Sequence, residues 1–136
     1  MRLFIAAAAD VEAQDAAAAV IMRLRRAPEA YRWVDPRDMH VTLRFLGETT
    51  EDKLPEISTL MCRASSQTAP FELVYGGVGA FDSLDDPRVV WLGLEKGAAP
   101  MERLAGLLGR EEPRPYAAHM TLGRRRGDAS APEFIA

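Results

Sequence analysis

The chain has 136 residues, 48% of them hydrophobic and 27% charged, and a net charge of −3. That charge excludes a uniformly basic protein that coats nucleic acid, but it leaves a local basic cleft open. The single cysteine, Cys62, excludes a disulfide framework within the chain, and no stretch approaches the ~20 apolar residues of a membrane span. We expect one compact globular domain, residues 1–136, in a reducing cytoplasm.

The first elements predicted along the chain are a strand, a helix and a loop. A basic residue followed by the apolar run Leu3–Ala9 resembles a short signal peptide, but Asp10 ends the run early, so we favour a buried strand over residues 2–9. Asp10 can cap a helix that reaches about residue 26, with Ala17, Ile21 and Leu24 on one face. Residues 27–38 contain two prolines and are expected to form a loop.

A second strand and helix follow. In residues 39–46 apolar side chains alternate with His40, Thr42 and Arg44, which predicts a strand that Gly47 closes. Thr49 or Thr50 is expected to cap the next helix. Its predicted buried stripe consists of Leu54, Ile57, Leu60 and Met61.

The second half of the chain predicts a similar succession of strands and a helix. Residues 71–81 and 88–95 read as two strands joined by a turn at 82–87, and Pro100 can open a short helix that Gly109 ends. The inward residues of that helix are expected to be Met101, Leu104 and Leu108. After a loop at 111–116, residues 117–123 predict another strand. The order indicates a weak internal duplication, with two α+β lobes.

Both histidines of the chain begin the same phrase. His40 and His119 are each followed, two residues later, by a threonine and then by a leucine, in HVTL and HMTL. Side chains on a strand alternate between faces, so the histidine and threonine of each motif project from one face about 7 Å apart. A lone histidine on a strand is more often structural than catalytic, but a repeated motif that includes every histidine favours a functional pair.

These four side chains suit phosphoryl transfer by general acid and base. One imidazole can accept a proton from the attacking oxygen while the other donates a proton to the leaving oxygen. The two hydroxyls can hold phosphate oxygens and stabilise the charge that develops on them. No metal or other cofactor is required by this chemistry.

The set of motifs resembles the 2H phosphoesterase superfamily, and within it the LigT-like RNA 2′,3′-cyclic phosphodiesterases, also called 2′-5′ RNA ligases. The resemblance is carried by MRLFIA, RWVDPRDMHVTLRFLGE, GGVGAF, PRVVWLGLE and RPYAAHMTLGR, and it extends from residue 1 to about 126. It implies an α+β fold of two pseudo-symmetric lobes, with antiparallel sheets lining a central cleft and helices outside. It also implies metal-independent hydrolysis of an RNA 2′,3′-cyclic phosphate to a 2′-phosphomonoester, with RNA ends or nucleotides as the partners, and possible 2′-5′ ligation.

The resemblance assigns roles to individual residues. His40 matches the proton donor to the leaving 3′ oxygen, and His119 matches the base that activates water. Thr42 and Thr121 match the threonines that hold the phosphate, and Arg124 matches an arginine near it. The alternative interpretation of Arg124 is a solvated member of the basic run 124–126.

Aromatic and basic residues near the motifs add candidates. Trp33, Phe81 and Tyr116 lie in or beside loops near the motifs and are candidates to stack on an RNA base, with a place in the core as the alternative. Trp91 lies in a strongly apolar segment and is expected in the core. Four arginines are candidates for the edge of a basic cleft, or for ordinary solvated positions: Arg32, Arg37, Arg44 and Arg114.

The chain departs from the family pattern in two places. Ala118 stands where the family usually has proline, and the chain ends at Ala136, where the family continues with further strands. Phe134 and Ile135 look like the start of an unfinished strand. We therefore expect an open sheet edge, and with it a homodimer through that edge or low stability.

Two other functions stay open. A protein that binds RNA ends, with turnover weak or lost because the second lobe is short, would share the same motifs. A metal site built on both histidines is weaker, because two histidines without a nearby cysteine or paired carboxylate rarely form a closed site.

Overall fold

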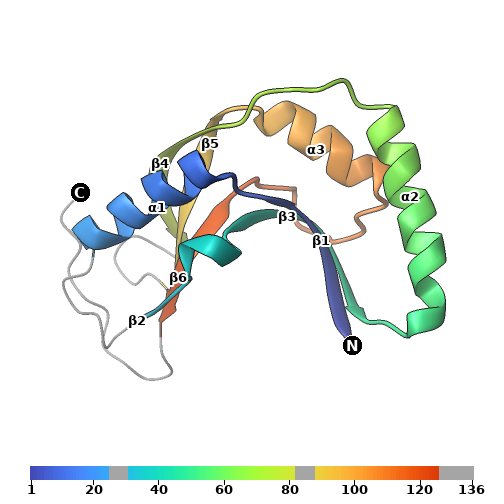
Figure 1. The fold of residues 1–136 in the computed structure, drawn as a ribbon, viewed down its shortest axis with the longest axis horizontal. Helices are drawn as coiled ribbons and strands as arrows, with labels where there is room; N and C mark the ends of the chain where they lie inside the picture. The colour runs from blue at the N-terminus through green and yellow to red at the C-terminus, as the bar shows by residue number, and fades with distance from the viewer. Residues whose placement is uncertain (25–30, 82–87, 126–136) are drawn as a thin grey trace.

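The computed structural model describes residues 1–24, 31–81 and 88–125, and these form an α+β fold (Figure 1). None of the helices in this part of the chain is long and apolar enough to cross a membrane. The strands are β1 (Arg2–Ala8), β2 (Tyr31–Trp33), β3 (His40–Glu48), β4 (Val74–Phe81), β5 (Val89–Lys96) and β6 (Met120–Arg125). The helices are α1 (Val11–Leu24), α2 (Leu54–Ser66) and α3 (Ala98–Leu107), with short 3-10 turns η2 (Pro36–Asp38) and η3 (Glu51–Lys53).

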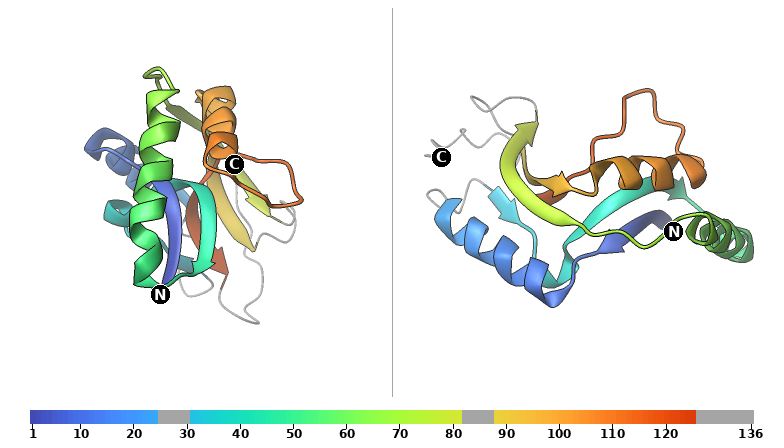
Figure 2. Two further views of the ribbon diagram at one scale, coloured as in Figure 1. Left: turned by 90° about the vertical axis from the view of Figure 1, so that its right-hand side faces the viewer. Right: turned by 90° about the horizontal axis from the view of Figure 1, so that it is seen from above.

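All six strands belong to one antiparallel sheet with the order β1-β3-β6-β5-β4, and β2 pairs with β6. Strands β3 and β6 share a single registered pair, Val41 with Met120. The β1–β3 half and the β6–β5–β4 half of the sheet therefore meet at one point. Figure 2 shows α1 and α2 at opposite ends of the molecule.

The core lies on one face of the sheet, which we call the core face. Val41 and Met120 are both 0% exposed and belong to one buried cluster with residues of helices α1 and α3. The helices contribute buried Ala17, Ile21, Leu24, Met101 and Ala105, and Leu108 at the C-cap of α3 is buried beside them. The predicted inner faces of α1 and α3 are thus confirmed, except that Ala105 is buried more deeply than Leu104.

Each motif strand has a β-bulge at the leucine that follows the threonine. On β3, Thr42 pairs with Ala6 and Arg44 with Ile5, so Leu43 has no partner on β1. On β6, Leu122 is likewise left out between the pairs that its neighbours form with β5. Both leucines are buried. Because an extra residue shifts the alternation by one, the residues after each bulge change face.

The bulge on β3 overturns the expected alternation after Leu43. Arg44 turns to the helices, where its Nη1 donates a hydrogen bond to the Leu108 carbonyl oxygen at 2.7 Å. Phe45 turns the other way, opposite Phe4, and is 61% exposed rather than buried. Gly47 does not close the strand, which continues to Glu48 with Gly47 at φ +70°.

The internal duplication is visible in the strand register. Residues 4–7 of β1 pair with β3 as residues 89–92 of β5 pair with β6. The equivalent cross-strand pairs are Ala7–Val41 with Leu92–Met120, Ala6–Thr42 with Trp91–Thr121, and Phe4–Phe45 with Val89–Arg124. The two motifs are therefore presented by copies of one unit.

Two helix ends behave as the sequence indicates. The Asp10 carboxylate accepts a hydrogen bond from the Ala13 backbone N–H at 2.8 Å, which caps α1. Gly109, at φ +79°, ends α3 in a Schellman motif, because the Gly109 and Arg110 N–H groups bond to Gly106 and Ala105.

Other expectations are wrong. Segment 27–38 was expected as a loop, but Tyr31–Trp33 forms β2, whose partner β6 lies far along the chain. Neither threonine caps α2, because the Thr49 hydroxyl donates to the Gly47 carbonyl oxygen and the Thr50 hydroxyl bonds to the Asp52 carboxylate. A 3-10 turn separates both from α2. The α2 stripe is only partly covered, since Leu54 and Met61 are 41% and 43% exposed.

One predicted strand is shorter in the structure, and two predicted segments lie outside the described residues. The strand expected over 71–81 begins at Val74. The predicted turn at 82–87 and the unfinished strand with Phe134 and Ile135 lie outside the described residues.

The bulge leucines should be stability determinants. Leu122→Ala removes a fully buried side chain, so we expect the free energy of unfolding to fall by about 2–4 kcal/mol. The matched control is Leu107→Ala on α3, where the side chain is 39% exposed and the loss should be clearly smaller. Urea titration of both variants measures this difference. Equal losses would show that the bulge leucine is not a packing anchor.

Candidate active site

The register between β3 and β6 places the four motif residues on one face of the sheet. Val41 pairs with Met120 and both side chains enter the core, so the residues on either side of them project from the opposite face. We call this the site face. Both histidines and both threonines thus flank the Val41–Met120 pair on this one face.

Both imidazoles are oriented in the same way. His40 Nδ1 lies 2.8 Å from the Asp38 carbonyl oxygen, and His119 Nδ1 lies 2.7 Å from the Ala117 carbonyl oxygen. A carbonyl oxygen can only accept, so Nδ1 carries the hydrogen in each ring. In the neutral ring Nε2 therefore keeps its lone pair, and in the charged ring it holds the proton that can be donated. Both Nε2 atoms are left for acid–base chemistry.

The turn before His40 is fixed by charge and by a cap. The Asp35 carboxylate accepts a hydrogen bond from the Arg37 backbone N–H at 2.9 Å and pairs with the Arg37 guanidinium at 2.8 Å. These bonds lower the pKa of Asp35 to about 2. The capped turn η2 ends at Asp38, whose carbonyl holds the His40 ring. The orientation of the His40 ring therefore depends on this capped turn.

Tyr116 connects the segment that precedes the second motif to β3, the strand of the first motif. Its hydroxyl donates a 2.8 Å hydrogen bond to the Thr42 carbonyl oxygen, and the Arg110 guanidinium lies 5.2 Å from its ring centroid. Burial raises the pKa of Tyr116 to about 12, so the hydroxyl stays a donor at neutral pH. This bond and the Val41–Met120 pair both fix the spacing of the motifs.

Aromatic rings flank each imidazole. Phe4 stacks on His40 with ring centroids 4.9 Å apart, and Phe81 and His119 form a T-shaped pair with ring centroids 5.0 Å apart. Trp91 lies 6.0 Å from His119. Its ring covers Gly79, where any Cβ would overlap the indole. Trp91 was expected in the core, and this is wrong: it is half-buried on the site face.

The other two base-stacking candidates do not present a ring on this face. Trp33 pairs with Gly123 and packs over it against the core, and the Tyr116 hydroxyl is used by Thr42. The structure instead shows Phe4 and Phe45, which are 6.3 Å apart and well exposed. The even spacing of Phe4, Ala6 and Ala8 hints at a common face, but only the bulge at Leu43 brings Phe45 to it.

Arg124 lies on the site face. The bulge at Leu122 places it opposite Val89, which pairs in turn with Phe81 beside His119. Its side chain is exposed, as is that of Arg32, its partner on β2. The exposed Arg37 bonds to Asp35 and Arg44 turns to α3, while Arg114 is exposed in the loop before β6.

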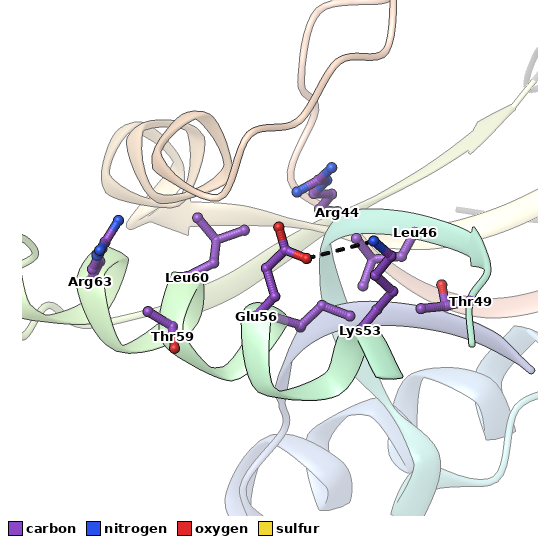
Figure 3. Close-up of a pocket in the computed structure, with 9 residues that line it drawn as sticks. Arg44, Leu46, Thr49, Lys53, Glu56, Thr59, Leu60 and Arg63 are labelled. Atoms are coloured by element: carbon purple, nitrogen blue, oxygen red, sulfur yellow. Dashed lines mark ion pairs between the residues drawn. The ribbon is translucent and has the colours of Figure 1, made fainter. Parts of the chain in front are cut away.

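A pocket of about 610 Å³ lies elsewhere, between α2 and the end of β3 (Figure 3). Its walls include Arg44 and Leu46, which the bulge turns away from the site face, and the 4.0 Å ion pair of Lys53 with Glu56. No motif residue lines it. The candidate acid–base residues lie on the site face and not in this pocket. Within the described ranges no three His, Cys, Asp or Glu side chains gather as a metal site requires.

Known proteins resemble this chain in sequence and in fold. The family model for LigT like Phosphoesterase matches residues 9–91. A protein of Archaeoglobus fulgidus named RNA 2′,3′-cyclic phosphodiesterase is 34% identical over 91% of this chain and 72% of its own length. A protein of Thermotoga maritima with the same name is 35% identical over 91% of this chain and 70% of its own length.

Solved structures agree with the sequence relatives. The crystal structure of a Thermus thermophilus protein, TT0787, matches with a TM-score of 0.81 and 29% identity, over 99% of this chain and 79% of that one. E. coli LigT in complex with 3′-AMP matches with a TM-score of 0.76 and 30% identity, over 99% of this chain and 77% of that one. The chain belongs to the LigT-like phosphoesterase family of 2H phosphoesterases.

Proposed function

We propose that this chain hydrolyses the 2′,3′-cyclic phosphate at the end of an RNA to a 2′-phosphomonoester, without a metal. The observation that carries the proposal is the pairing of Val41 with Met120, from which the histidine and threonine of both motifs project on one face of the sheet. The names of the relatives from A. fulgidus and T. maritima supply the substrate class.

The mechanism needs one neutral and one charged imidazole. His119 Nε2 takes a proton from water as the water oxygen attacks phosphorus. His40 Nε2 gives its proton to the 3′ oxygen as the P–O3′ bond breaks, which leaves a 2′-phosphate and a 3′-hydroxyl. The carbonyls of Ala117 and Asp38 hold Nδ1–H of each ring and so aim Nε2 at the reacting atoms. The polarity of His40 and His119 follows the family pattern.

Thr42 and Thr121 donate hydrogen bonds to the non-bridging phosphate oxygens, on which negative charge develops in the transition state. Arg124 neutralises this charge from the same face. The exposed rings of Phe4 and Phe45 border the His40 side, where the ribose that carries the 3′ oxygen must lie, and they offer a surface for the base. E. coli LigT was solved with 3′-AMP and with ATP, which supports a nucleotide as the ligand.

A protein that binds RNA ends without turnover is the second function that the motifs permit. The chain spans about 70% of the length of the two relatives described above. Their activity is therefore a proposal for this chain, and a direct assay of turnover decides between the two functions.

The assay is hydrolysis of adenosine 2′,3′-cyclic phosphate in excess EDTA, with the product identified by phosphorus NMR. We expect turnover to adenosine 2′-phosphate with a bell-shaped pH profile, because one imidazole must be charged and the other neutral. His40→Gln and His119→Gln should each lower kcat about 10²–10⁴-fold. Thr42→Val and Thr121→Val should cost less, about tenfold, because each removes one donor.

Each result has a defined meaning. A fully active His119→Gln protein would exclude the mechanism, and a 3′-phosphate product would reverse the roles of His40 and His119. Loss of turnover in EDTA that returns with a divalent metal would contradict the metal-free reaction. Binding of adenosine 2′-phosphate with no turnover by the unmodified chain would favour the binding protein.

Tyr116 should affect the reaction rate only by positioning Thr42 and its strand. Tyr116→Phe leaves the Thr42 carbonyl without its donor, so we expect kcat to fall about three- to tenfold with KM little changed. Tyr75→Phe is the matched control, because it deletes the same atom from another half-buried tyrosine, on β4. Equal rates for Tyr116→Phe and Tyr75→Phe would remove Tyr116 from the account.

A second readout follows from the raised pKa of Tyr116. A tyrosine that ionises near pH 12 when folded and near 10.0 otherwise stabilises the fold fully below pH 10 and loses this contribution between pH 10 and 12. Denaturant titrations across this range should show a shallower alkaline loss of stability in Tyr116→Phe than in the unmodified protein.

A further inference from the structure

Two arginines lie side by side at one end of the site face. Arg32 on β2 pairs directly with Arg124 on β6, and both side chains are exposed. Their neighbours Tyr31 and Trp33 alternate to the other face, where Tyr31 is buried and Trp33 packs against the core. Since Arg124 lies on the site face, its cross-strand partner Arg32 lies there too.

This pair is unfavourable without an anion. Like charges directly opposite each other on a sheet repel. In the part of the chain that the structure describes, neither guanidinium forms an ion pair with a carboxylate. The chain as a whole is negative, so the concentration of positive charge is local. A bound phosphate group would turn the repulsion into two charge-assisted contacts.

The internal duplication shows that the pair belongs to one half only. Arg124 stands five residues after His119, and the equivalent residue after His40 is Phe45, which faces Phe4. Strand β2, which brings Arg32, pairs with β6 alone. The acid–base groups of the two halves match, whereas the surroundings are aromatic on the His40 side and cationic beyond Thr121. A substrate with distinct base and phosphate ends can bind such a face in one orientation.

We propose that Arg32, together with Arg124, forms a second phosphate subsite, which binds the phosphate adjacent to the reacting one in an RNA. Thr121, Arg124 and Arg32 follow one another outward from the acid–base groups, across two neighbouring strands about 4.8 Å apart. The subsite makes a 5′-phosphorylated or longer RNA end a better ligand than a bare nucleoside phosphate. This proposal rests on the proposed function for the identity of the ligand.

The test compares two ligands by calorimetry: adenosine 2′,5′-bisphosphate, which has a second phosphate, and adenosine 2′-monophosphate, which does not. In low salt the unmodified protein should bind the bisphosphate about tenfold more tightly. Arg32→Gln should bring this ratio close to one, and Arg32→Lys should keep part of it. The matched control is Arg103→Gln, which removes an exposed cation from α3 and should keep the full ratio. Added salt should lower the ratio.

The subsite is overturned if the unmodified protein binds the two ligands equally or binds neither, or if Arg32→Gln keeps the ratio of the Arg103→Gln control. Circular dichroism of each variant confirms that the comparison is between folded proteins. Binding is measured without turnover, so the outcomes separate: a tenfold ratio without hydrolysis supports the subsite and contradicts the proposed function. Hydrolysis with a ratio of one does the reverse.

Discussion

The pairing of Val41 with Met120 is the constraint on which the site depends. It is the single registered pair between β3 and β6, and both side chains are fully buried. A slip of one residue would turn each histidine and threonine of one motif to the core face. Burial of two large apolar side chains against α1 and α3 opposes that slip. Apolar packing on one face of the sheet therefore fixes the polar chemistry on the other face.

The duplicated strand units explain why the two motifs have the same local geometry. The pairings of β1 with β3 and of β5 with β6 match residue for residue, including a bulge at Leu43 and at Leu122. The leucine that follows each threonine is thus the buried residue of a bulge, which keeps the motif anchored to the core. Equal units give equal imidazoles, each held through Nδ1 by the carbonyl two residues before it.

Different roles for two equal imidazoles require different surroundings. At equivalent positions the first half has Phe4 and Ala6, and the second has Val89 and Trp91. After the bulge the first half presents Phe45 and the second presents Arg124. In the proposed mechanism the acid and the base are distinguished by the orientation of the substrate, with its nucleobase toward the exposed rings and its phosphates toward the arginines.

Local signals in the sequence predicted much of this structure. Asp10 caps α1 and Gly109 ends α3 as predicted, because each depends only on neighbouring residues. The two His-x-Thr-Leu phrases define the candidate site in the same local way. The α+β class and the family follow from the same pattern of elements and motifs.

What the sequence did not predict depends on partners far along the chain. Strand β2 is only three residues long, so it shows no periodicity in the sequence. It forms because it pairs with β6. The positions of Arg44 and Phe45 depend on a bulge that breaks strict alternation. Trp91 was placed in the core because its segment is strongly apolar. Gly79 on the next strand instead leaves room for its ring beside His119.

The central claim is that both histidines contact one phosphate. Proton NMR tests it directly, because the chain has only two histidines and each contributes one Cε1–H resonance. During titration with adenosine 2′-monophosphate we expect both resonances to shift together with a single dissociation constant. Movement of only one resonance, or two different constants, would contradict the convergence of the two motifs on one site.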